Sequence, residues 1–132
     1  MPTGSERTGI DRTDRRRSIR LGAGRGVSIV VVTVEVHDNP DAQRYEAVVD
    51  GELAGFAAYS TQQGLIAFVH TEVEDAFEGH GVGSILIGGA LDDARRRGFE
   101  VLPFCPFVNS FIVEHHEFVD LVPGSRREEF GL

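Results

Sequence analysis

The chain has 132 residues, the length of one ordinary domain, and 41% of them are hydrophobic, as in globular proteins. Its single cysteine excludes an internal disulfide and favours a reducing compartment, so we expect a cytoplasmic protein. No apolar run approaches the roughly 20 residues of a membrane-spanning helix, and we expect no membrane partner.

Charge is divided unevenly along the chain, whose formal net charge is −8. Residues 1–26 carry seven arginines and three acids, and residues 27–132 carry six arginines and eighteen acids. The strongly acidic larger part disfavours nucleic-acid binding and suits a cationic or amine-bearing partner. Residues 1–26 lack an apolar pattern, so we interpret them as a disordered basic arm. The folded domain is expected over 27–122, followed by a polar tail over 123–132.

Four strands are expected in the first half of that domain, because β-branched and aromatic residues dominate short runs there. The runs are Val27–His37, Tyr45–Val49, Leu53–Ser60 and Leu65–Val73. Asp50-Gly51 and Gln62-Gln63-Gly64 are turn signals between neighbouring runs. Short turns between strands predict an antiparallel meander.

After the fourth run, the spacing at which apolar residues recur changes from the two residues of a strand to the roughly 3.6 residues of a helix. A helix is predicted after Gly83, with charged residues 92, 93 and 95–97 mostly on its other face, and Gly98 is a typical stop. A fifth strand over Phe99–Phe104 precedes a second helix over Asn109–Phe118. Pro103 and Pro106 place the end of the fifth strand near a sheet edge or a splay. The fold class is therefore α+β.

Three alternating glycines, Gly79, Gly81 and Gly83, stand directly before the first helix. Glycines there let backbone N–H groups approach an anion, and the helix dipole favours negative charge at the same point. The pattern predicts a pyrophosphate site, although a tight turn without a ligand would also use glycine. A P-loop is excluded because the chain has no lysine. A dinucleotide fold would place its glycines after the first strand of a parallel unit.

These motifs, taken in order, resemble the GNAT N-acetyltransferase superfamily, and within it the very small GNAT-like members that lack the first helices. The resemblance covers roughly residues 27–122. It is carried by residues 70–73, 78–83, 90–95, 103–107 and 115–122. Glu78 departs from the Gln or Arg of the family motif.

The resemblance implies that acetyl-CoA is the cofactor. It also implies a splay between the fourth and fifth strands, where the thioester sits. It implies that backbone groups of Val73 hold the pantetheine arm. The pyrophosphate would be held by the amides of Gly79, His80, Gly81, Val82, Gly83 and Ser84.

Four side chains are candidates for the chemistry of acyl transfer. Cys105 could act as a nucleophile or as a proton donor to the leaving thiolate, or it could be a buried apolar residue. His115 or His70 could be its cationic neighbour. His70 and Glu72 share one face of the fourth strand, and either could accept a proton from the incoming ammonium, or both could be solvated polar residues.

We therefore expect an N-acetyltransferase that moves acetyl from acetyl-CoA to a primary amine of a protein, a peptide or a small molecule. The amine attacks directly, or Cys105 carries the acetyl group first. The alternative is a non-catalytic acyl-CoA-binding module. No metal site is expected, since the adjacent His115 and His116 lack the i, i+4 spacing of a helical ligand pair. The sequence indicates neither the acceptor nor the oligomeric state.

Overall fold

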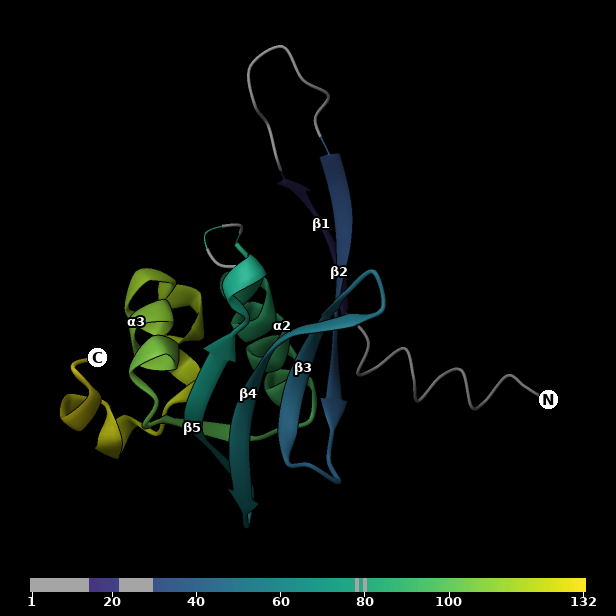
Figure 1. Ribbon diagram of the computed structural model, residues 1–132. Helices are drawn as coiled ribbons and strands as arrows, with labels where there is room; N and C mark the ends of the chain where they lie inside the picture. The colour runs from purple at the N-terminus through teal and green to yellow at the C-terminus, as the bar shows by residue number, and fades with distance from the viewer. Residues whose placement is uncertain (1–14, 22–29, 78, 80) are drawn as a thin grey trace.

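A computed structural model describes residues 15–21, 30–77, 79 and 81–132 (Figure 1). Its strands are β1 (Arg15–Leu21), β2 (Val30–Asn39), β3 (Arg44–Val49), β4 (Glu52–Gln62), β5 (Leu65–Val73) and β6 (Glu100–Pro103). Its α-helices are α2 (Val82–Arg96) and α3 (Pro106–Glu114). Short 3₁₀ helices are η1 (Asp75–Phe77), η2 (His116–Leu121), η3 (Gly124–Arg126) and η4 (Glu128–Phe130).

The strands form one sheet in the order of the sequence, β1 to β6. Neighbouring strands are antiparallel from β1 to β5, whereas β5 and β6 are parallel and α2 makes the crossover between them. Asp50 and Gly51, with φ of 52° and 80°, form the tight turn between β3 and β4. The predicted α+β class, the meander and the helix–strand–helix order are confirmed.

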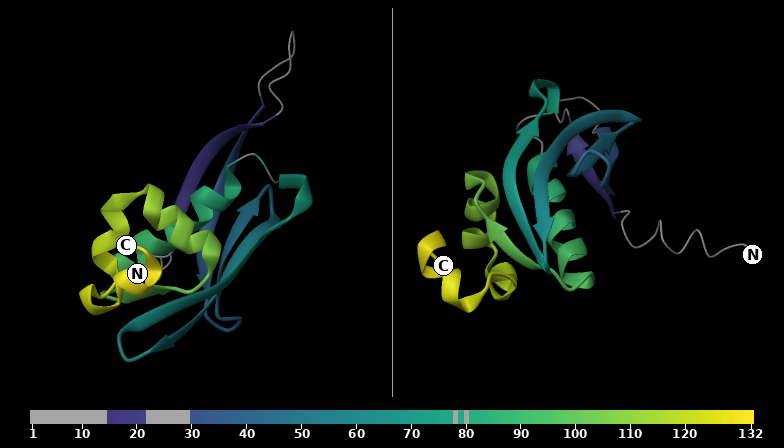
Figure 2. Two further views of the ribbon diagram at one scale, coloured as in Figure 1. Left: turned by 90° about the vertical axis from the view of Figure 1, so that its left-hand side faces the viewer. Right: turned by 90° about the horizontal axis from the view of Figure 1, so that it is seen from below.

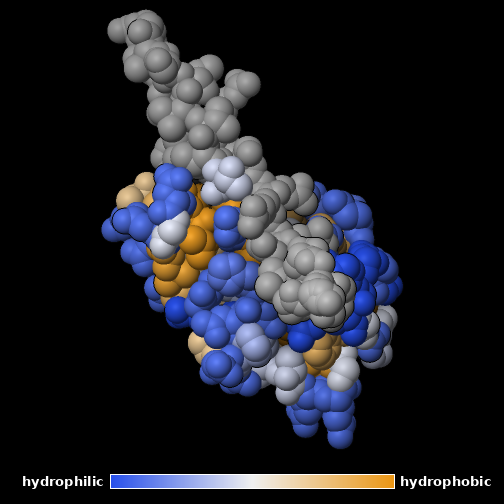
Figure 3. Space-filling model, turned by 90° about the vertical axis from the view of Figure 1, so that its right-hand side faces the viewer, coloured by the Kyte–Doolittle hydropathy of each residue, from blue (hydrophilic) through white to orange (hydrophobic). Residues whose placement is uncertain are grey.

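Helix α2 packs across one face of the sheet, and α3 lies beside the β5–β6 edge (Figures 1 and 2). Buried aliphatic residues of α2, among them Leu86, Ile87 and Leu91, meet Tyr45, Phe68 and their neighbours from the sheet in one core. Seen from the side of the β1–β2 edge, the described surface is mostly hydrophilic, with a few hydrophobic patches (Figure 3). No helix in the described ranges is long and apolar enough to cross a membrane.

The prediction of a disordered arm over 1–26 is wrong for residues 15–21. They form β1, which pairs with β2 from Arg15 opposite Val36 to Leu21 opposite Val30. Local composition gave no strand signal, because this edge strand is defined by its backbone pairing with β2. Its arginines are typical of an edge strand that resists pairing with other chains. Residues 1–14 and 22–26 lie outside the described residues.

The predicted bounds of the second helix are also wrong. Helix α3 begins at Pro106, because proline suits the first turn of a helix, and ends at Glu114. Phe118 lies instead in η2, which is tied to α2 where Arg95 donates to Asp120 Oδ2 at 2.8 Å and to the Glu117 carbonyl at 2.8 Å. The tail predicted to be merely polar forms η3 and η4, and its Phe130 packs against the core.

A buried ionic network joins the end of α2 to the sheet. Asp93 is only 1% exposed, although its helical position predicted a solvated face. Its carboxylate accepts hydrogen bonds from Tyr45 Oη at 2.5 Å and Arg97 Nη1 at 3.0 Å, and it also pairs with Arg96. Arg97 reaches on to Asp38 of β2 at 2.9 Å. The network fixes the orientation of α2.

We predict that Asp93→Asn lowers the free energy of unfolding by about 2–4 kcal/mol, because it leaves Arg96 and Arg97 without their buried carboxylate. Urea unfolding followed by circular dichroism measures the difference. Asp41→Asn, the same change at an exposed turn position, is the control and should alter stability by less than about 0.5 kcal/mol. Equal effects of the two variants would contradict a structural role for the network.

The acid sensitivity of the fold should depend on the same carboxylate. Burial opposes ionisation of Asp93, but hydrogen bonds from Tyr45, Arg96 and Arg97 outweigh it and hold its pKa below the usual value. Because the folded pKa is lowered, the stabilisation is complete above the pKa of the unfolded chain, about 3.9, and is lost as the pH falls further. The stability difference between wild type and Asp93→Asn should therefore shrink below about pH 4. A difference that stays constant down to pH 2 would contradict this.

Candidate functional site

The site begins where β5 and β6 separate. Their parallel pairing runs from Leu65 opposite Glu100 to Phe68 opposite Pro103, and β5 then continues alone on that side to Val73. The Cys105 N–H donates to the Phe68 carbonyl at 2.8 Å, and α3 begins at the next residue. The predicted splay between the fourth and fifth strands is thus observed directly after Phe68.

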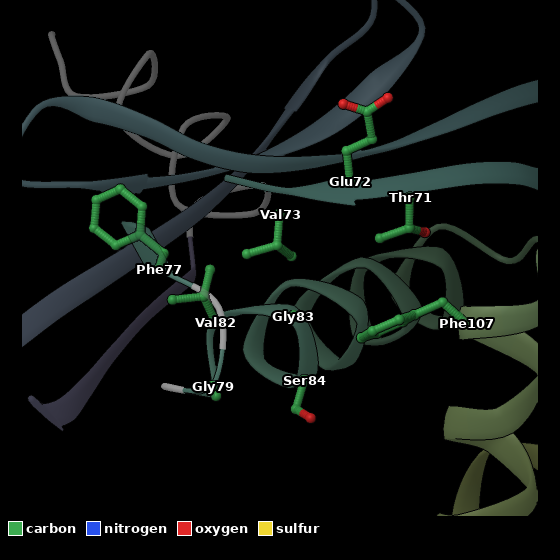
Figure 4. Close-up of a pocket in the computed structure, with 10 residues that line it drawn as sticks. Thr71, Glu72, Val73, Phe77, Gly79, Val82, Gly83, Ser84 and Phe107 are labelled. Carbon is green, nitrogen blue, oxygen red and sulfur yellow. The ribbon is translucent and has the colours of Figure 1, made fainter. Parts of the chain in front are cut away.

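A pocket of about 570 Å³ lies between the freed end of β5, the start of α2 and the start of α3 (Figure 4). It is lined by Thr71, Glu72, Val73, Phe77, Gly79, Gly81, Val82, Gly83, Ser84 and Phe107.

Backbone groups of β5 also face the opening. The Glu74 N–H donates to the Ala54 carbonyl on the β4 side at 2.8 Å. Because successive backbone groups of a strand point to alternate sides, those of Val73 and Thr71 are directed away from β4, toward the opening. The splay therefore presents main-chain donors and acceptors to the pocket.

The glycine turn ends in the N-terminus of α2. Gly79 and Gly81 both have a φ of 84°, a left-handed conformation that glycine adopts without strain. Gly81 is the N-cap, and the first backbone bond of the helix runs from the Ile85 N–H to its carbonyl at 3.1 Å. The N–H groups of Val82, Gly83 and Ser84 precede that bond and have no partner within the helix. They make the start of α2 suitable for an anion. Glu78 and His80 lie outside the described residues.

Gly83 serves a different purpose from the two glycines before it. A β-carbon on Gly83 would lie 2.6 Å from Cζ of Phe107, a residue of the first turn of α3. The absence of a side chain lets this ring pack against the first turn of α2, where it forms one wall of the pocket. All three glycines were predicted to lie at the anion site, and the packing contact of Gly83 with Phe107 was not predicted.

Cys105 lies behind the pocket and does not line it. Its side chain is buried, at 3% exposure, and its sulfur lies 3.3 Å from the hydroxyl oxygen of Thr71. Thr71 faces this way because of a bulge: Tyr59 pairs with Phe68 and Ala58 with His70, which leaves Val69 as an extra residue. The bulge reverses the alternation of side chains along β5. Thr71 therefore shares the face of Phe68.

Residues 44–121 match the sequence profile of the GCN5-related N-acetyl-transferase family. The chain belongs to this family. The matched segment runs from β3 to η2 and includes every residue that lines the pocket. No curated protein sequence matches the chain.

In this member of the GCN5-related N-acetyl-transferase family, His70 and Glu72 are paired. His70 Nε2 lies 2.7 Å from Glu72 Oε2, and both side chains are more than half exposed. Their shared face, expected from the alternation, is observed. It is the face away from Thr71, and Glu72 points away from α2 (Figure 4). Neither side chain is hydrogen-bonded to Cys105.

The remaining histidine candidate lies in a neighbouring hollow. His115 caps the end of α3, where Nδ1 is 2.8 Å from the Phe111 carbonyl and its ring stacks on Phe111 with centroids 3.9 Å apart. It lines a second hollow, with Arg95 and Glu117, and no hydrogen bond joins it to Cys105. The predicted pairing of Cys105 with a histidine is thus not observed. Within the described ranges, no group of three or more His, Cys, Asp or Glu side chains is placed to hold a metal ion.

The contact between Gly83 and Phe107 predicts a change of sign between two backgrounds. In wild type, Gly83→Ala should destabilise the protein by about 1–3 kcal/mol, because the new methyl group clashes with the ring. In Phe107→Ala, the same change should be neutral or stabilising by up to about 1 kcal/mol, since alanine is the better helix former. Chemical unfolding of the four proteins measures both effects. The same destabilisation in both backgrounds would contradict the packing role.

Proposed function

We propose that this protein transfers the acetyl group of acetyl-CoA to a primary amine. The observation that carries the proposal is a single pocket in which the freed backbone of β5 meets the N-terminus of α2. A thioester of coenzyme A has both a pantetheine amide chain and a pyrophosphate, and this pocket offers partners for each. When bound, acetyl-CoA supplies the activated acetyl group.

The residues of the pocket fit coenzyme A by their chemistry. The amides of Val82, Gly83 and Ser84 would hold the pyrophosphate, and the open backbone of Gly79 and Gly81 leaves room for it, since a β-carbon there would meet no atom within 4 Å. The first turn of α2 contains no acidic residue that would repel the phosphates. Backbone groups of Thr71 and Val73 would pair with the pantetheine amides.

The amine would approach from the His70–Glu72 side of β5. The net charge of residues 27–132 is strongly negative, which attracts a protonated amine. Glu72 would attract the ammonium group, and the His70–Glu72 pair would accept its proton, so that the free amine can attack. A backbone N–H freed by the splay would stabilise the oxyanion that this attack creates.

The position of Cys105 supports direct attack by the amine. Its sulfur is buried and contacts Thr71, so the free protein does not present it to the pocket as a nucleophile. We assign it a role in proton transfer and not as the carrier of the acetyl group. Mass spectrometry tests the assignment, because incubation with acetyl-CoA alone should leave Cys105 unacetylated.

Turnover is the test of the proposed function. Purified protein with acetyl-CoA and a panel of peptide lysines, polyamines and small primary amines should release coenzyme A, measured with a thiol reagent, and should yield the acetylated amine. Binding of acetyl-CoA without turnover on any amine would favour a non-catalytic acyl-CoA-binding module. Absence of both binding and turnover would contradict the proposal.

Ser84 allows a sharper test of the pyrophosphate site. Ser84→Asp should raise the Kd for coenzyme A at least about tenfold, because a carboxylate in the first turn of α2 repels the phosphates. An acidic residue there stabilises a helix, so weaker binding could not be attributed to unfolding. Ser84→Asn, similar in size but neutral, is the control and should bind almost as well as wild type. Equal binding by both variants in calorimetry would contradict this site.

A further inference from the structure

The Thr71 hydroxyl is the polar side-chain group that joins the buried Cys105 to the pocket. Thr71 lines the pocket, whereas Cys105 does not, and their Oγ1 and Sγ atoms lie 3.3 Å apart. Figure 4 shows Thr71 at the end of the pocket near Phe107, away from Gly79 and Ser84. If the phosphates lie at Gly79 and Ser84, the far end of the pocket receives the thioester.

The protein holds this contact in place from both sides. Cys105 is fixed by the bond from its N–H to the Phe68 carbonyl at 2.8 Å and by its position as the N-cap of α3. Thr71 is held within β5, where it pairs with Ala57 of the neighbouring strand β4, a fully buried residue. The bulge at Val69 is required for the contact, since strict alternation from Phe68 would direct Thr71 to the opposite face. Bulges often re-aim a side chain beside an active site.

We infer that Thr71 is a catalytic residue that passes a proton from Cys105 to the sulfur of the departing coenzyme A. This inference rests on the proposed function. The amine nitrogen forms a bond to the acetyl carbon, the carbon–sulfur bond breaks, and its electron pair stays on the coenzyme A sulfur. The Thr71 hydroxyl gives its proton to that sulfur while its oxygen accepts the proton of the Cys105 thiol.

The cycle closes without a further reagent. After the products leave, the Cys105 thiolate recovers a proton from water in the pocket, through Thr71 in the reverse direction. The His70–Glu72 pair passes the ammonium proton to solvent before the attack and then takes the second proton, which the nitrogen loses after it bonds to the acetyl carbon. Two protons leave the nitrogen and one returns from water to Cys105, so acetylation of a protonated amine releases one proton overall. The donor and the final acceptor of the proton are both alkyl thiol sulfurs, so the relay joins two groups of the same chemical class.

Kinetics of Thr71→Val and Thr71→Ser test the inference. Valine keeps the shape of threonine but lacks the hydroxyl, and serine keeps the hydroxyl. We expect Thr71→Val to lower kcat by about 10- to 100-fold with little change in KM for acetyl-CoA, and Thr71→Ser to retain most of the activity. Cys105→Ala should lower kcat similarly, and the double variant should be no slower than the slower single one. Additive losses, or a Thr71→Val enzyme as fast as wild type, would overturn the relay.

A second readout needs no turnover. Alkylation of Cys105 by iodoacetamide in the free protein, followed by mass spectrometry, should be at least about fivefold faster in Thr71→Ala than in wild type, because the side chain that covers the sulfur is removed. Thr71→Ser should stay near wild type. Equal rates in all three would overturn the placement of Thr71 between Cys105 and the pocket. If wild type acetylates no amine, the proposed function fails together with the relay. If wild type acetylates an amine and Thr71→Val has the same kcat, the relay fails and the proposed function stands.

Discussion

The separation of β5 from β6 after Phe68 is the feature on which the rest of the site depends. Parallel strands normally satisfy each other's backbone groups along their full length. Here the last pair is Phe68 with Pro103, which has no N–H to donate, and the Cys105 N–H makes the final bond to β5. Chain that would have continued β6 becomes α3 instead. One short region thus opens the pocket, frees the backbone of β5 and places a cysteine at the base of the opening.

The two helices keep the opening from closing. Phe107 packs against Gly83 at the start of α2 and separates the two helix ends. At the other end of α2, Asp93 is bound to Tyr45 of β3 and to Arg97. A helix held at both ends has little freedom to rotate, so its first-turn amides stay directed at the pocket. Preorganised donors of this kind bind an anion without paying for their own ordering.

Local pattern in the sequence was enough to predict the order of the elements. The meander followed from short β-branched runs and turn residues, and β5 was predicted at the bounds that the structure shows. Helix α2 followed from its apolar period and the stop at Gly98. Strand β1 and the bounds of α3 were missed, because the first depends on pairing with β2 and the second on a proline that begins a helix. The spacing of hydrophobic residues along the chain indicates neither of these features.

The site was predictable in its backbone part and less so in its side chains. Glycines before a helix indicated the anion site, but nothing in the sequence distinguished Gly83, whose role depends on a ring 24 positions later. The bulge at Val69 leaves no local signal, so the contact between Thr71 and Cys105 could not be predicted. Asp93 was assigned to solvent for a similar reason, since its partners Tyr45 and Arg97 meet only in the folded chain.

The central claim is that coenzyme A binds in the splay, along β5 and against the first turn of α2. Titration of the ¹⁵N-labelled protein with coenzyme A, followed by amide NMR, tests this claim most directly. The predicted result is that the largest shifts occur at Thr71, Val73, Gly81, Gly83 and Ser84, with little change along β2 and β3. Shifts that spare these amides and gather elsewhere on the sheet would contradict the account.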